Sequence, residues 1–128
     1  MQKAQKGFTL IELVVVIVLL GILGVTALAR FQDLSTDAQT AANAGVASEI
    51  SSGASINYAA RSLNSLNGTS TTALTCAGVA AAVLSSPLDI AYVVGGATCV
   101  GATTGDSVSC TVTNAPGAVA TASVICIN

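Results

Sequence analysis

The chain of 128 residues lacks histidine and tryptophan and has few charged or aromatic side chains. Charged residues make up 8% of it, against about 25% in an ordinary soluble domain. Without histidine, neither a Ser/His/Asp triad nor a histidine metal site can form. We therefore expect no enzyme, no cofactor and no metal site, and a chain that keeps much of its surface out of water.

Basic residues are also scarce, and the formal net charge is −2. No basic cluster attracts a phosphate backbone. Two phenylalanines and two tyrosines provide no stacking platform for single-stranded nucleic acid. The sequence therefore predicts no nucleic-acid site.

Four cysteines lie in the C-terminal half, at Cys76, Cys99, Cys110 and Cys126. An even number in one region predicts two disulfides formed in an oxidising compartment, and free thiols or a zinc site are the alternatives. Zinc is disfavoured because the chain has no CxxC pair. All three connectivities are permitted. We expect Cys110–Cys126, across an Asn-Ala-Pro-Gly turn, and Cys76–Cys99.

An apolar stretch begins near the N-terminus and runs from Phe8 to Ala29, with Glu12 as its one charge. As a helix, these 22 residues span about 33 Å, enough to cross a hydrocarbon core of about 30 Å. Lys3 and Lys6 precede the stretch and predict a cytoplasmic N-terminus. A secretory signal cleaved after Ala29 is the alternative, but the polar head is short and Glu12 interrupts the apolar region.

The helical pattern continues beyond the apolar stretch, because apolar or small residues recur every three or four positions from residue 30 to residue 66. No proline occurs before Pro87. We therefore predict one continuous helix from Phe8 to about Leu66, with an amphipathic second half. Asn67-Gly68 then marks a loop.

Residues 67–128 have the composition of a small β-rich head. A short helix is expected at 76–86, and strands are expected at 90–94, 107–113 and 119–127, where β-branched residues alternate or form apolar runs. Packing of this antiparallel sheet on the long helix gives an α+β fold. The expected parts of the chain are a leader that is removed (1–7), a transmembrane half of the long helix (8–29), an amphipathic half of the same helix (30–66) and a β-sheet head with the disulfides (67–128).

The string Gly7-Phe8-Thr9-Leu10-Ile11-Glu12, before the apolar run, resembles the processing site of type IV pilins and pseudopilins. The resemblance implies removal of residues 1–7 by a prepilin peptidase, cleavage between Gly7 and Phe8, and N-methylation of Phe8. It also implies a single-pass inner-membrane precursor that assembly machinery builds into an extracellular pilus. The apolar run further resembles the mannose-sensitive haemagglutinin subgroup.

Glu12 is unusual because carboxylates are rare within membrane segments and need a functional reason. The resemblance implies that it pairs with the amine released on Phe8 of a neighbouring subunit, whereas on physical grounds alone it could equally reach the membrane interface. Gly21 and Gly24 are candidates for loosening the helix or admitting a neighbour closely. Ala29 stands where many pilins have a helix-disturbing proline, so the expectation of local melting is weakened.

We therefore predict a structural subunit that forms a homopolymeric pilus for adhesion, motility or uptake. One alternative is a minor pilin or a pseudopilin of type II secretion. Another is a membrane-anchored surface domain that binds a target and does not polymerise. The response of filament formation to loss of Glu12 separates the last alternative from the first two.

Overall fold

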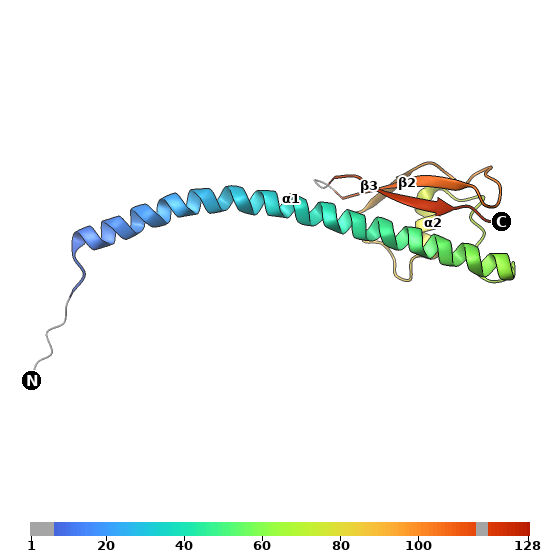
Figure 1. Ribbon diagram of the computed structural model, residues 1–128, viewed down its shortest axis with the longest axis horizontal. Coiled ribbons are helices and arrows are strands. Elements are labelled where there is room, and N and C mark those ends of the chain that lie inside the picture. Colours follow the sequence, from blue (N-terminus) through green and yellow to red (C-terminus); the bar gives the residue numbers. More distant parts are fainter. Residues whose placement is uncertain (1–6, 115–117) are drawn as a thin grey trace, which may run out of the picture. The chain divides into compact units, whose positions relative to one another are not determined.

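The computed structural model describes residues 7–114 and 118–128 (Figure 1). Most of the expected leader and part of the expected Asn-Ala-Pro-Gly turn lie outside these residues. The chain divides into two compact units, Met1–Ser35 and Thr36–Asn128. We describe the units separately.

One long helix, α1, runs from Leu10 to Leu63 and contributes residues to both units. The prediction of a single helix is confirmed, and the structure differs from it by two or three residues at each end. At the C-terminal end, Asn64 takes over the hydrogen bonding. Its backbone carbonyl accepts from the Asn67 amide at 2.9 Å, and its side chain accepts from the Leu66 amide at 2.9 Å. These turns stop the helix before the positive φ of Gly68.

Helix α2 spans Cys76–Val83 and is shorter than the predicted 76–86. Its N-cap is Thr75, whose hydroxyl accepts a hydrogen bond from the Gly78 amide. The chain becomes extended at Leu84, three residues before Pro87.

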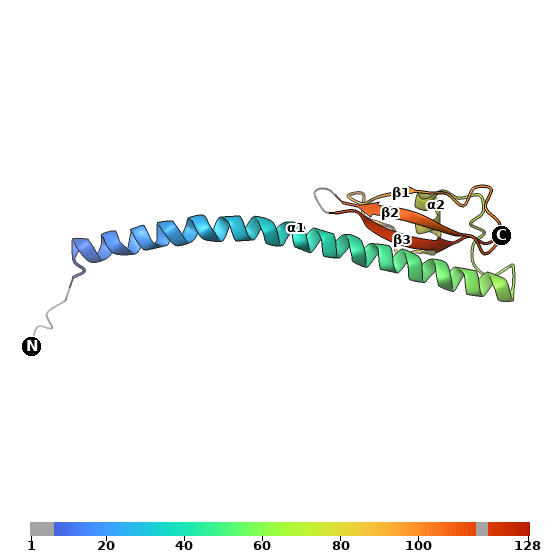
Figure 2. The same cartoon turned by 45° about the horizontal axis from the view of Figure 1, so that its top comes forward.

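Three strands, β1 (Val93–Gly96), β2 (Ser107–Thr113) and β3 (Ala120–Ile125), form an antiparallel sheet in the order β1-β2-β3 (Figure 2). The prediction of an antiparallel sheet is confirmed. Strand β1 begins later than expected because Asp89 holds the preceding residues in a turn. The Asp89 carboxylate accepts from the Ala91 amide, and its backbone carbonyl accepts from the Tyr92 amide.

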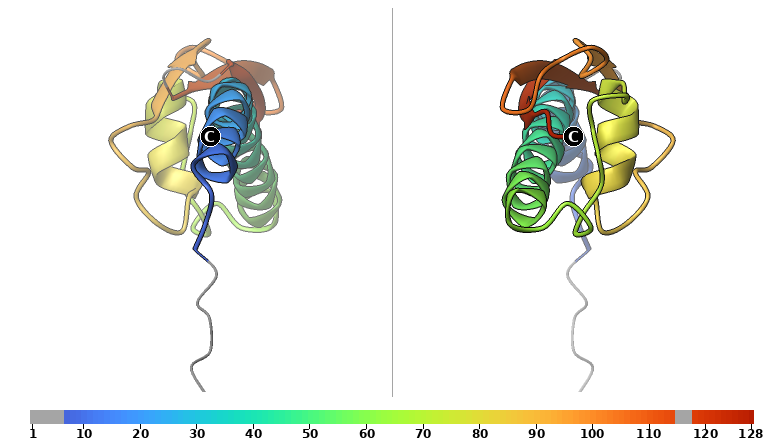
Figure 3. Two further views of the ribbon diagram at one scale, coloured as in Figure 1. Left: turned by 90° about the vertical axis from the view of Figure 1, so that its left-hand side faces the viewer. Right: turned by 90° about the vertical axis from the view of Figure 1, so that its right-hand side faces the viewer.

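The core of the second unit lies among α2, the sheet and residues of α1 that follow Thr36 (Figure 3). Ala47, Ile50 and Ala54 of α1 are buried against the other elements. Gly53 lies on the same helix, and a Cβ added there would come within 2.8 Å of the Val83 carbonyl oxygen. Glycine at this position therefore permits close approach of the end of α2.

The two disulfides are Cys76–Cys110 and Cys99–Cys126, so the predicted pairing was wrong. The register of β2 with β3 explains the error, because Cys110 lies opposite Ala122. Cys126 is four residues beyond Ala122, about 13 Å farther along the strand, and a disulfide needs Cα atoms within about 7 Å. Cys110 points into the core and meets Cys76 at the start of α2, with the two Cα atoms 5.6 Å apart.

Candidate assembly site

The start of α1 is fixed by a reciprocal cap between Thr9 and Glu12. The Glu12 carboxylate oxygen Oε2 accepts from the Thr9 amide at 2.8 Å and from the Thr9 hydroxyl at 2.7 Å. The Thr9 hydroxyl oxygen in turn accepts from the Glu12 amide at 3.3 Å. A threonine followed three residues later by a glutamate is the sequence of a capping box, which satisfies amides left free at a helix N-terminus.

The second carboxylate oxygen of Glu12, Oε1, takes part in no hydrogen bond among the residues that the structure describes. Within the described residues, Glu12 therefore uses one carboxylate oxygen to cap its own helix. Among the described residues of this unit, Arg30 is the one basic residue, and it is eighteen residues, or about 27 Å of helix, away.

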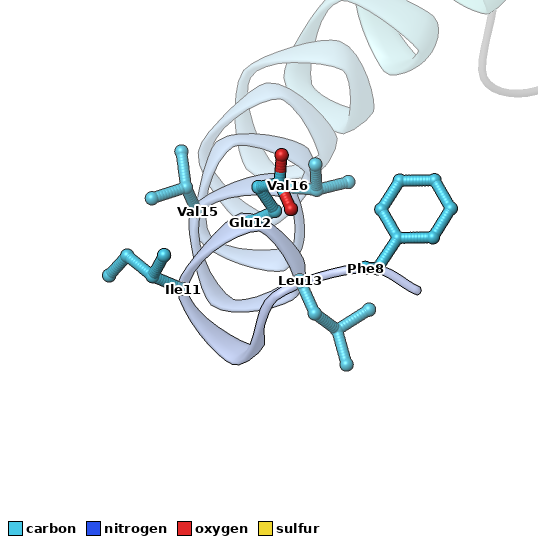
Figure 4. Close-up of a pocket in the computed structure, with 6 residues that line it drawn as sticks. All are labelled: Phe8, Ile11, Glu12, Leu13, Val15 and Val16. Carbon is cyan, nitrogen blue, oxygen red and sulfur yellow. The ribbon is translucent and has the colours of Figure 1, made fainter. Parts of the chain in front are cut away.

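Apolar side chains surround this carboxylate and project outward from the start of α1 (Figure 4). Phe8 is 92% exposed and Leu10 is 80% exposed, and the large apolar residues from Leu13 to Leu28 are also exposed. Exposed apolar surface on this scale marks a membrane or protein contact. Among the described residues, α1 is the one helix that is long and apolar enough to cross a membrane.

Gly7, the expected cleavage position, is exposed, and a Cβ there would meet no atom within 4 Å. Gly7, Phe8 and Thr9 precede α1 and are not helical. Both residues of the Gly7–Phe8 peptide bond are therefore exposed, and the missing side chain of Gly7 removes one obstacle to a protease.

Gly21 and Gly24 lie inside α1, and a Cβ at either position would also meet no atom within 4 Å. Gly21 lines a hollow on the helix surface together with Val18, Ile22 and Val25. The open surface at both glycines could accept a neighbouring backbone. Their role in loosening the helix stays a prediction.

Thr9 is the functional residue that the sequence interpretation missed. The interpretation treated Thr9 as one letter of a processing motif, in which it assigned roles to Gly7, Phe8 and Glu12 but none to Thr9. The signal that could have identified it is the Thr-x-x-Glu spacing immediately before an apolar helix.

A short polar head, a glycine and a capped apolar helix in this order are similar to the start of type IV pilin precursors. A family model described as the prokaryotic N-terminal methylation motif matches residues 2–28. The matched residues are about a fifth of the chain, and they precede an α+β head. The narrower haemagglutinin subgroup stays a prediction.

Curated relatives match a stretch of 37 or 38 residues. The chain is 55% identical over 38 residues to both "Fimbrial protein Q" and "Type IV major alpha-pilin" of Moraxella bovis. The aligned residues make up 30% of this chain and 24% of each relative. It is 51% identical over 37 residues to a "Fimbrial protein" of Pseudomonas aeruginosa, covering 29% of this chain and 24% of the relative. The chain thus matches about a quarter of the length of these relatives. No solved structure matches.

Proposed function

We propose that this chain is a non-catalytic structural subunit of a type IV pilus, which polymerises through α1. The observation that carries the proposal is the N-terminal segment itself. It matches the methylation motif over residues 2–28, and it leads into a helix whose apolar side chains are exposed from Leu10 to Leu28. Such a surface needs lipid before assembly and neighbouring helices after it.

The precursor is inserted in the inner membrane by residues 8–29, with its basic N-terminus in the cytoplasm. A prepilin peptidase cleaves between Gly7 and Phe8, and the new N-terminus on Phe8 is methylated. The accessible, non-helical stretch before α1 supports this step. The head, which carries two disulfides, matures on the oxidising side of the membrane.

Glu12 supplies the contact that sets the position of one subunit against the next. Its Oε2 remains on Thr9, while Oε1 accepts from the methylated ammonium group of Phe8 in a neighbouring copy. In an apolar assembly, each of these opposite charges is unfavourable alone and is stabilised by the other. Incorrect registers leave both charges without partners.

Replacement of Glu12 by alanine in the full chain tests this function. The expected result is loss of sheared surface filaments while the amount of subunit in the inner membrane stays unchanged. Glu49→Ala is the matched control, because Glu49 is also an exposed carboxylate of α1. Unchanged filaments in the Glu12→Ala strain would contradict the proposal.

A further inference from the structure

Arg30 and Asp37 are exposed charges of opposite sign on α1. They are seven residues apart, which is two helical turns or about 10.5 Å. Helical ion pairs form between residues three or four apart, so this spacing does not favour a pair within one chain. Arg30 and Asp37 are therefore not expected to pair with each other within one chain.

Arg30 directly follows the apolar residues that form the proposed assembly surface. It is the one basic residue between Phe8 and Arg61. When the apolar helices of several copies pack together, Arg30 loses part of its water. A charge that loses water needs a partner of opposite charge.

The three charges Glu12, Arg30 and Asp37 recur on one face of the helix. Arg30 is eighteen residues after Glu12, which is five turns of 3.6 residues, and Asp37 is two turns farther on. Two parallel copies without a relative shift would bring like charges together. A shift of about two turns instead brings Arg30 of one copy to the level of Asp37 of the other.

The proposed function requires a shift of this size, and the present step rests on it. Phe8 of one copy must reach Glu12 of the next. Along the chain axis, Phe8 and Glu12 are at most about 10 Å apart. Two residues of extended chain contribute ~3.3 Å each and two residues of helix ~1.5 Å each. The seven-residue spacing of Arg30 and Asp37 is about 10.5 Å, so one shift satisfies both contacts.

We propose that Arg30 of one copy forms an ion pair with Asp37 of the adjacent copy and is a second register contact of the filament. The planar guanidinium group can bind a carboxylate through two hydrogen bonds, which makes the pair directional as well as attractive. The partner for this surface is therefore a second copy of the same chain.

Charge exchange in the full chain tests the pair. Arg30→Asp and Asp37→Arg should each lower the yield of sheared filaments at least ~10-fold, as expected for a close interfacial charge pair. The double exchange should restore the yield to within ~3-fold of the unaltered chain. Glu49→Arg is the control: it makes the same charge change at an exposed position of α1 and should leave the yield unchanged.

Cysteine cross-linking provides a test that does not depend on filament yield. Under mild oxidation, a chain with Arg30→Cys and Asp37→Cys should give a ladder of covalent multimers, and neither single cysteine variant should give more than dimers. Failure of the double exchange to restore filaments, or absence of the ladder, would overturn the pairing. If only the Arg30–Asp37 pairing is wrong, Glu12→Ala still abolishes filaments. If the proposed function itself is wrong, Glu12→Ala leaves the filaments unchanged.

Discussion

The disulfide connectivity leads to a prediction about stability that paired cysteine replacements can test. Replacement of Cys76 and Cys110 together removes one bridge and leaves Cys99–Cys126 intact. Cys76–Cys110 has a sequence separation of 34 residues. Chain entropy gives about 3.8 kcal/mol for a loop of this size. For Cys99–Cys126, with a separation of 27 residues, the corresponding value is about 3.6 kcal/mol.

A mixed replacement of Cys76 and Cys99 removes one partner from each bridge. The remaining Cys110 and Cys126 are four residues out of register and cannot pair without rearrangement of the strands. This variant should therefore lose roughly 7 kcal/mol, about twice the loss of the paired replacement and comparable with the whole stability of a typical domain.

Urea unfolding of the full chain in detergent, followed by tyrosine fluorescence, measures the difference. Thiol titration of the urea-unfolded protein, in which the buried cysteines are exposed, provides an independent measurement. It should find no free thiol after the paired replacement and two after the mixed one. A mixed variant that is as stable as the paired variant and has no free thiol would refute the connectivity.

Three further predictions concern single side chains. Gly53→Ala should destabilise the head by about 1–3 kcal/mol, because the new methyl group meets the Val83 carbonyl, and a lower urea midpoint would show it. Hydrogen bonds from the Thr103 amide and hydroxyl lower the pKa of the Asp106 carboxyl group in the folded state. The ionised carboxylate therefore stabilises the fold above the unfolded pKa of about 3.9, and this stabilisation is lost as the pH falls through the lower folded pKa. Asp106→Asn should therefore reduce the acid dependence of the urea midpoint, and an unchanged pH profile would contradict this assignment. Thr9→Ala should lower filament yield ~5-fold through loss of the helix cap, while Thr9→Ser should retain the cap and the yield.

The sequence was sufficient for the long helix because its signals are local. Apolar and small residues recur at helical spacing, and proline is absent before Pro87. Strands β2 and β3 were also predictable, since the buried positions Cys110, Val112, Ala122 and Val124 alternate with polar ones. In both cases, the pattern within one segment determines which face is buried.

The disulfide pairing could not be predicted because it depends on how separate segments align. The expectation of Cys110–Cys126 used only their places on either side of a turn. The actual register places Cys110 opposite Ala122 and turns its side chain toward Cys76. Strand register depends on packing of the whole head, which no short sequence window contains.

The candidate site was predicted in part. Gly7, Phe8 and Glu12 follow from a motif that can be read directly, and their roles in processing and assembly stay predictions. The reciprocal bonds between Thr9 and Glu12 add a local role that the sequence interpretation did not consider. The capping box explains how one carboxylate can order its own helix and still offer an oxygen to a neighbour.

The central claim is that the processed chain polymerises through its N-terminal helix, and intact mass spectrometry of sheared surface filaments tests it most directly. We predict that this chain is present in the filaments, begins at N-methylated Phe8 and has lost four hydrogens to its two disulfides. A chain that begins at Met1, or at Arg30 after cleavage behind Ala29, would contradict the account. So would filaments that lack the chain while it is present in the membrane.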